Sequence, residues 1–162
     1  MIILSDYCPI CNSKNIEIEN IEYDFPKIGK SILYVFKCKD CGYKTSEIIP
    51  LEEKQPVKIE IKIDNQEKFK MIILKSPYAK LILKEIDLEI LPGIESKFEI
   101  KALDDLITNI KEKLESMKPL FIDEKDKYDK LIEKINYLED VLKNKKELTI
   151  IIEDEKGYSM IY

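Results

Sequence analysis

In several short segments of the chain, apolar residues recur at or near every second position, which is the period of a half-buried β-strand. Before residue 40 two such strands are predicted, one by Ile16, Ile18 and Ile21 and the next by Ile32, Tyr34 and Phe36. Pro26 and Gly29 stand between them and predict the turn at the tip of a hairpin. The polar stretch 45–56 contains two prolines and predicts a linker or a first edge strand leading into a second unit.

That second unit begins as further β structure. Strict alternation at Val57, Ile59, Ile61 and Ile63 predicts one strand. Shorter strands are predicted at 71–74, at 79–83, around Ile86, Leu88 and Ile90, and in the closing segments 148–153 and 158–162. We therefore expect two domains, residues 1–47 and residues 48–162.

From residue 103 the apolar period changes to steps of three and four, which predicts a helical hairpin at about 103–145. Pro119 is expected to end the first helix and Asp123 to cap the second. The apolar stripe of the second helix, from Tyr128 to Leu142, is interpreted as the seam of this hairpin. A dimer-forming coiled coil is the alternative interpretation of the same stripe.

Composition narrows the possible chemistry. The chain has 162 residues, about one domain's worth, with 44% hydrophobic and 36% charged residues, and it contains no His. All 27 basic residues are Lys, so Arg is also missing. These absences exclude His-based triads, His-bearing zinc fingers and bidentate Arg contacts to guanine or phosphate. We expect a protein that is not an enzyme.

Charge and the chain ends point to a protein partner in the cytoplasm. The net charge of -5 repels polyanions, and no apolar run approaches the length of a membrane span. The N-terminal sequence MIILSDYC has no basic start and no cleavage site of the kind found in secretory signals. We therefore expect a cytoplasmic monomer that binds neither membranes nor, in general, nucleic acid.

The four cysteines form one pattern. Cys8 and Cys11 make a C-x2-C pair, and after 26 residues Cys38 and Cys41 make a second. Two such pairs suit one tetrahedral zinc ion, and four thiolates leave no position for a reactive water, so the zinc would be structural. Two disulfides or a redox-active C-x-x-C are the alternatives. With the two strands between the pairs, the pattern predicts a zinc ribbon.

The tip of that ribbon is the candidate partner surface. Phe25, Ile28 and Gly29 lie in a loop between strands that the metal would anchor, so apolar side chains there could meet a partner at little entropic cost. The alternative is that Phe25 and Ile28 pack onto the second β unit.

In order along the chain, the segments CPIC, FPKIG, CKDCGY, LKSPYAKL, KEIDLEILPG and DEKGYSMI resemble the ZPR-type zinc-finger proteins. The resemblance covers nearly the whole chain as one module, of the kind expected from an archaeal member. It implies a mainly β fold, in which a four-cysteine zinc ribbon precedes a distorted double-stranded β-helix, jelly-roll-like, with the helical hairpin inserted. Asp154, Gly157 and Ser159 resemble the family's Asp-x-x-Gly-x-Ser turn, interpreted as a structural turn, with a binding role as the alternative.

The resemblance also implies a function. Eukaryotic relatives are described as partners of translation elongation factor 1-alpha that help this GTPase fold, and as binders of some receptor kinases. We expect a zinc-binding protein-interaction module of the first kind. A zinc-ribbon adaptor of transcription or translation that contacts nucleic acid is the alternative, and the negative charge and missing Arg disfavour it.

Overall fold

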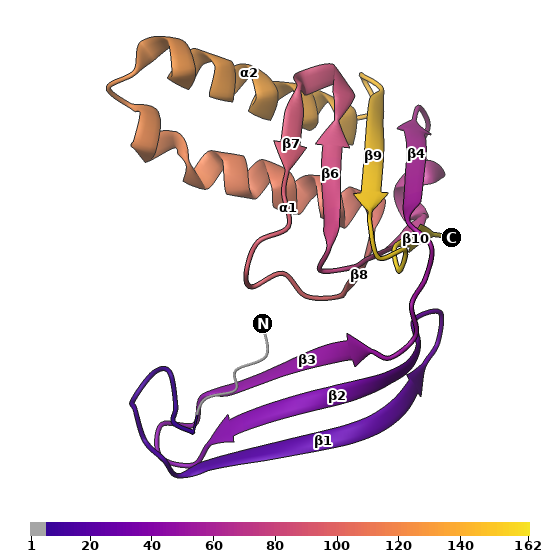
Figure 1. Cartoon of the computed structure of the whole chain (residues 1–162). Coiled ribbons are helices and arrows are strands. Elements are labelled where there is room, and N and C mark those ends of the chain that lie inside the picture. Colours follow the sequence, from indigo (N-terminus) through magenta and orange to yellow (C-terminus); the bar gives the residue numbers. More distant parts are fainter. Residues whose placement is uncertain (1–5) are drawn as a thin grey trace.

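The computed structural model describes residues 6–162, and Figure 1 shows a long three-stranded ribbon below a larger body of strands and helices. Residues 1–5 of the predicted ribbon domain, and with them most of the N-terminal segment that was compared with signal sequences, lie outside the described residues. The fold is mainly β, as predicted, with ten strands and two α-helices in the described part of the chain.

The ribbon is an antiparallel sheet in the order β1-β2-β3. The predicted strands are present as β1 (Ile16–Phe25) and β2 (Gly29–Cys38), in continuous register from Ile16 opposite Cys38 to Phe25 opposite Gly29. The segment expected to be a linker or first edge instead supplies a third ribbon strand, β3 (Lys44–Pro50), which pairs with β2. Half-buried Ile48 and Ile49 hold it there, so the ribbon sheet runs past the predicted boundary at residue 47.

The larger body contains two sheets. One has the order β4-β9-β6-β7, and the other has the order β10-β5-β8. Their strands are β4 (Val57–Ile63), β5 (Ile72–Lys75), β6 (Ala79–Leu83), β7 (Leu88–Ile90), β8 (Glu99–Ala102), β9 (Leu148–Asp154) and β10 (Met160–Ile161). All neighbouring pairs are antiparallel, and the last strands of the chain lie among the first ones of this body. This exchange between early and late strands is the arrangement expected of a jelly roll.

The predicted helical hairpin is formed by α1 (Leu103–Ser116) and α2 (Lys125–Leu142). Asp123 is not the cap of α2: the helix begins at Lys125 with Glu124 in the cap position and no side-chain cap bond. The reason is that Pro119 lies within a short 3₁₀ turn, Lys118–Phe121, which delays the start of the second helix. Lys111 and Glu139 join the two helices through an ion pair of 2.5 Å.

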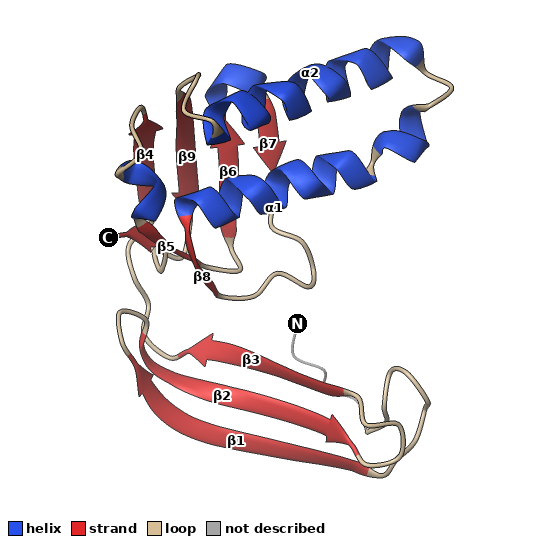
Figure 2. Ribbon diagram, turned by 180° about the vertical axis from the view of Figure 1, so that it is seen from behind, coloured by secondary structure: helices blue, strands red, loops and turns tan. Residues whose placement is uncertain are grey.

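Both helices cover one face of the four-stranded sheet (Figure 2). The apolar stripe of α2 packs there with α1 and the inward residues of β6 and β9, so in this structure it is the seam of the hairpin and part of the main core. The opposite face of the sheet carries ion pairs such as Lys58 with Glu153 and Lys84 with Glu60. None of the helices among residues 6–162 has the length and apolar character to cross a membrane.

Candidate metal centre

The four cysteines meet at one end of the ribbon. Their sulfur atoms all lie within 4.8 Å of one another, and the Sγ atoms of Cys8 and Cys41 and those of Cys11 and Cys38 are each 3.6 Å apart. A tetrahedral ion with metal–sulfur bonds of about 2.3 Å separates its sulfur ligands by about 3.8 Å. The donor set and its spacing therefore fit one zinc ion held by Cys8, Cys11, Cys38 and Cys41.

Two equivalent turns place these sulfurs. In the first, the amide of Cys8 donates to the carbonyl of Ser13, and the amide of Asn12 donates to Cys8; in the second, Cys38 and Gly42 repeat both bonds. Asn12 and Gly42 occupy the same place in each turn and both have positive φ, 58° and 75°. Glycine and asparagine tolerate this conformation best, so the sequence after each second cysteine suits the turn.

The sulfurs are electrostatically prepared for a cation. Burial acts to raise the pKa of Cys8, but the backbone amides of Cys11 and Ile10 outweigh it and lower this pKa to about 7. A backbone amide of Ser13 favours the Cys11 thiolate, yet burial and the three neighbouring thiols raise its pKa to about 12. One thiolate forms easily and further ones repel one another, which is the charge problem that a divalent ion resolves.

No disulfide joins the cysteines within the described chain, since all four are free thiols. Each sulfur is instead close to sulfurs of the other turn, the arrangement of one shared ion rather than of a single redox-active pair. With four protein ligands the site is closed, so its chemistry is structural and it offers no position to a reacting water.

Three polar residues between and beside the cysteines join the two turns, and sequence reasoning missed them. Ser13 donates a hydrogen bond to Asp40, and the side-chain amide of Asn15 donates to the other carboxylate oxygen of Asp40 at 2.7 Å. The backbone of Lys39 also donates to the carbonyl of Asn15 at 2.9 Å. These bonds hold the two halves of the site together through contacts outside the sulfurs.

The opposite end of the ribbon is not a free surface. Ile28 is only 4% exposed and packs with Leu74 and Tyr158 of the jelly roll, while Phe25 is half-buried against the same cluster. Gly29 also faces the joint, because a β-carbon there would lie 3.2 Å from the Glu52 carboxylate. The interpretation of Ile28 as a presented partner contact is therefore corrected: apolar burial makes this tip the joint between the two domains.

Asp154 is the centre of the closing turn that forms the other side of that joint. Its buried Oδ2 accepts hydrogen bonds from the hydroxyls of Ser76 and Ser159, both at 2.7 Å, and from the amides of Tyr158 and Ser159. Burial acts to raise the Asp154 pKa, but these bonds outweigh it and lower the pKa. The motif has the structural role expected of it, and all its buried oxygens have partners.

The turn fastens the segment that connects the domains. The Tyr158 hydroxyl donates to the carbonyl of Glu52, and the Lys54 ammonium donates to the carbonyl of Lys27 at the ribbon tip, at 2.7 Å. Lys27 in turn lies 3.7 Å over the ring of Tyr162. Ribbon tip, connecting segment and C-terminal turn are thus tied together by several independent contacts.

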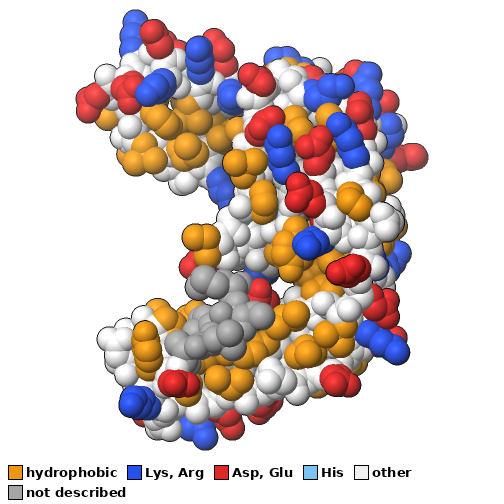
Figure 3. Space-filling view, viewed as in Figure 1, with side chains coloured by type: hydrophobic (Ala, Val, Ile, Leu, Met, Phe, Trp, Pro, Cys, Tyr) orange, Lys and Arg blue, Asp and Glu red, His pale blue; other side chains and the backbone are white. Residues whose placement is uncertain are grey.

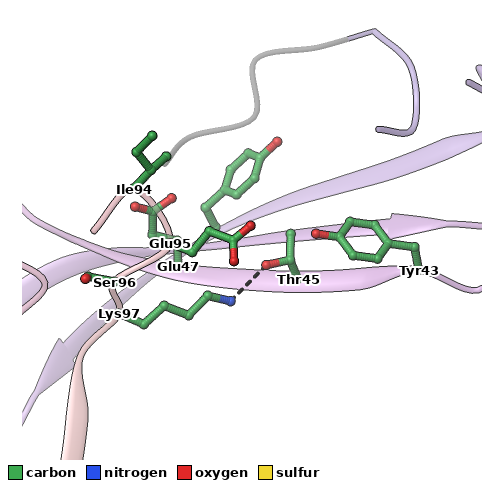
Figure 4. Close-up of a pocket in the computed structure, with 8 residues that line it drawn as sticks. Tyr43, Thr45, Glu47, Ile94, Glu95, Ser96 and Lys97 are labelled. Atoms are coloured by element: carbon green, nitrogen blue, oxygen red, sulfur yellow. Dashed lines mark hydrogen bonds between the residues drawn. The ribbon is translucent and has the colours of Figure 1, made fainter. Parts of the chain in front are cut away.

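Along the ribbon, β3 faces the jelly-roll loop that follows β7, and a small groove of about 200 Å³ lies between them. Figure 4 shows its lining, with the ammonium of Lys97 pointing across the groove to the hydroxyl of Thr45 at 2.9 Å. Ile94 and Glu95 stand on the loop side, and Glu47 and Tyr43 on the ribbon side. This hydrogen bond is a further contact between ribbon and jelly roll, closer to the cysteines than the joint.

Large apolar side chains are exposed at the free ends of the ribbon and the hairpin. Ile10 is 65% exposed beside the cysteines, and Leu120 and Ile122 are each 72% exposed at the hairpin turn. Both ends project to the same side of the molecule in Figures 1 and 2, and Figure 3 shows the space between the two arms open on that side. Sequence reasoning predicted the hairpin but missed the exposed apolar residues at its turn, although LFI after Pro119 is an apolar run where a solvated turn is usual.

A four-cysteine ribbon joined to a jelly roll with an inserted helical hairpin defines a class of metal-binding protein. The family model for the ZPR1 jelly-roll domain matches residues 67–162, which include all of β5 to β10 and both helices. The chain belongs to the ZPR1 family.

Individual relatives agree with this assignment. An uncharacterized ZPR1-like protein of Pyrococcus horikoshii is 27% identical over 157 residues, which are 95% of this chain and 70% of the relative. The zinc finger protein ZPR1 of Drosophila melanogaster is 26% identical over 162 residues, but this chain covers 34% of its length. The zinc finger chaperone zpr1 of Schizosaccharomyces pombe is 27% identical, with 30% of its length covered. The chain thus corresponds to one module of the eukaryotic proteins.

Proposed function

We propose that this protein is a zinc-loaded folding partner of translation elongation factor 1-alpha. The observation that carries the proposal is the pair of projecting arms, ribbon and hairpin: their ends project to the same side of the molecule, and each end carries exposed apolar side chains. An incompletely folded GTPase exposes apolar surface, which such ends can bury. The fission yeast relative carries the name zinc finger chaperone, which supports a role of this kind here.

In this proposal zinc is structural, and its role is to make the cysteine end of the ribbon rigid. The apolar cluster inside the ribbon is small, comprising buried Tyr34 and Phe36 with Cys8 and Cys38. Bound zinc would hold the end of the ribbon in one shape, so that Tyr7 and Ile10 meet a client without first being ordered.

The protein acts in this proposal as a cytoplasmic monomer without catalytic activity of its own. The closed set of four thiolates supports the absence of metal-based hydrolysis. The outer ribbon strand β1 carries Glu17, Glu19, Glu22 and Asp24 and no lysine, which argues against nucleic acid as the partner of the ribbon.

A refolding assay tests the proposal. Denatured elongation factor 1-alpha is diluted into buffer containing GTP, with or without an equimolar amount of the zinc-loaded protein, and the recovered factor is measured by GTP binding. We expect the protein to raise recovery several-fold and Leu120→Asp to remove most of that gain, because a charge at the hairpin turn opposes apolar contact.

Asn136→Asp is the matched control, because it adds the same charge at an exposed position of α2 away from the turn. It should leave recovery unchanged. Equal recovery with and without the zinc-loaded wild-type protein would refute the proposal. Salt-sensitive binding of RNA at about 0.15 M salt would favour the adaptor function instead.

A further inference from the structure

A cleft of about 350 Å³ lies on the jelly roll between the β6–β7 edge of the four-stranded sheet and α1. Its described lining residues all belong to the jelly roll, and none of them is a cysteine or a hairpin-turn residue used above. Volumes from about 300 Å³ upward are typical of sites for small organic ligands. The cleft is therefore large enough to be considered as a binding site of its own.

The floor of the cleft is apolar. Ala79 and Leu81 of β6 and Leu106 and Ile110 of α1 line it, and all four are buried members of the main core. On α1 the lining positions 106, 109, 110 and 113 follow the three-and-four spacing of one helix face. A ligand that covers this floor needs an alkyl or other apolar part.

Charged side chains also line the cleft. The cleft is lined by three lysines, Lys75, Lys101 and Lys113, and by two glutamates, Glu95 and Glu99, so its charge is +1. Lys101 pairs with Glu99 at 3.2 Å. Within residues 6–162, neither Lys75 nor Lys113 has a side-chain ion pair or hydrogen bond. A single anionic group bound there would give the half-buried Lys75 a partner and neutralise the cleft.

The position of Lys75 explains why it lacks a partner. It lies directly opposite Glu99 in the β5–β8 register, but that carboxylate is engaged by Lys101 two residues along the same strand. Burial lowers the pKa of Lys75 against an opposing effect of Glu99, and Lys101 and Lys113 lower it further. The ammonium is thus held in an environment that favours an added negative charge.

We propose that this cleft binds an aliphatic carboxylate, with the alkyl part on Leu81, Leu106 and Ile110 and the carboxylate on the ammonium of Lys75. Lys113 and the side-chain amide of Asn109 line the cleft from α1 and are further donors for the carboxylate. The carboxylate has two chemical sources, a free aliphatic acid and the C-terminal carboxylate of a peptide that ends in an apolar residue. A monoanion fits the charge of the cleft, and the apolar floor distinguishes it from a site for inorganic phosphate.

Titration of the full-length, zinc-loaded protein with sodium octanoate tests the site, read from the methyl NMR signals of Leu81 and Ile110. We expect saturable shifts at these two residues, and at least tenfold weaker binding of octanol, which has the same chain without the charge. Acetyl-Leu-Leu with a free carboxylate, compared with its C-terminal amide, tests the peptide source in the same way. If octanoate binds and the peptide acid does not, the ligand of the cleft is a free aliphatic acid. If the peptide acid binds more tightly than octanoate, the ligand is the C-terminal carboxylate of a peptide.

Variants locate the carboxylate. Lys75→Met keeps the length of the side chain and removes its charge, and it should weaken octanoate binding at least tenfold. Lys145→Met makes the same change at an exposed position after α2 and should have no effect. Absence of shifts at Leu81 and Ile110, equal binding of octanol, or unchanged binding by Lys75→Met would each overturn the proposal. The octanol comparison uses the wild-type protein, so it holds even where a variant folds poorly.

Discussion

Gly157 lies against the carbonyl group of Gln55, so closely that a β-carbon at residue 157 would be 1.9 Å from that oxygen. The glycine also has a φ of 73°, which other residues rarely adopt. The contact is between backbone atoms of the C-terminal turn and of the segment connecting the domains. No side-chain rotation can relieve it.

Gly157→Ala should therefore lower the free energy of unfolding by about 2 kcal/mol or more, because it adds a steric clash to backbone strain. Thermal and denaturant unfolding measure the change. Gly42→Ala is the control: its φ is 75°, but nothing lies within 4 Å of the added carbon. Equal losses of stability in the two variants would show that backbone strain, and not the clash with Gln55, accounts for the effect of Gly157→Ala.

Asp154→Asn should change how stability depends on pH. The folded-state pKa of Asp154 is lowered, so its contribution is complete above the unfolded pKa of about 3.9 and is lost as pH falls through the folded value. The variant lacks this contribution, and its deficit relative to wild type should shrink as pH falls below about 4. Denaturant unfolding at a series of pH values measures the deficit.

The control for this experiment is Asp64→Asn. The Asp64 pKa is also lowered, mainly by Lys68, but this carboxylate is exposed, so its contribution should be small. A deficit of Asp154→Asn that stays constant from pH 7 to pH 2 would contradict the role of its ionised form.

Cys38→Ser should abolish metal binding and unfold the ribbon while the jelly roll stays folded. The ribbon's own apolar cluster is small. The buried residues of the main core all lie between Ile63 and Ile152, outside the ribbon, so the jelly roll does not need the metal site for its packing. Elemental analysis should give one zinc per wild-type chain and less than a tenth of that for the variant. NMR spectra should then lose the dispersed signals of β1 to β3 alone.

Chelation and metal return provide the control for that prediction. Wild-type protein stripped of metal should lose the same ribbon signals and regain them when zinc is added, and the variant should not regain them. A metal-free ribbon that keeps its signals would show that the cysteines do not hold its fold.

Ile28→Ala should loosen the joint between ribbon and jelly roll. Truncation removes apolar contacts with Leu74 and Tyr158 in a buried cluster, at a cost of about 2 kcal/mol if all of them are lost. NMR relaxation should show the ribbon tumbling with more independence from the jelly roll. Ile18→Ala, at an exposed position of β1, should leave the relaxation unchanged.

Some features of this molecule follow from local sequence and others do not. Strict alternation from Val57 to Ile63 and the steps of three and four after Leu103 predicted β4 and α1, because each pattern has one period and one buried face. The four cysteines were predicted as one site because all the information is in their spacing and chemistry.

The rest depended on partners that are distant in the chain. Ile28 and Leu74 are 46 positions apart, and nothing near residue 28 indicates which apolar surface it meets. The sequence left the β3 segment open between a linker and an edge strand of the second unit, because its pairing with β2, rather than its own weak alternation, makes it a strand. Asp40 likewise depends on the two turns being brought together before Ser13 and Asn15 can reach it.

The ribbon is also a lever. Its strands β1 and β2 each span ten residues, so the cysteine end stands about 30 Å from the joint at a rise of about 3.3 Å per residue. A rotation of about 5° at the joint would displace that end by about 3 Å. This displacement exceeds the variation in donor–acceptor distance that a hydrogen bond tolerates. The width of the opening between the two arms therefore depends on contacts at the joint, far from either tip, such as those of Gly157 and Ile28.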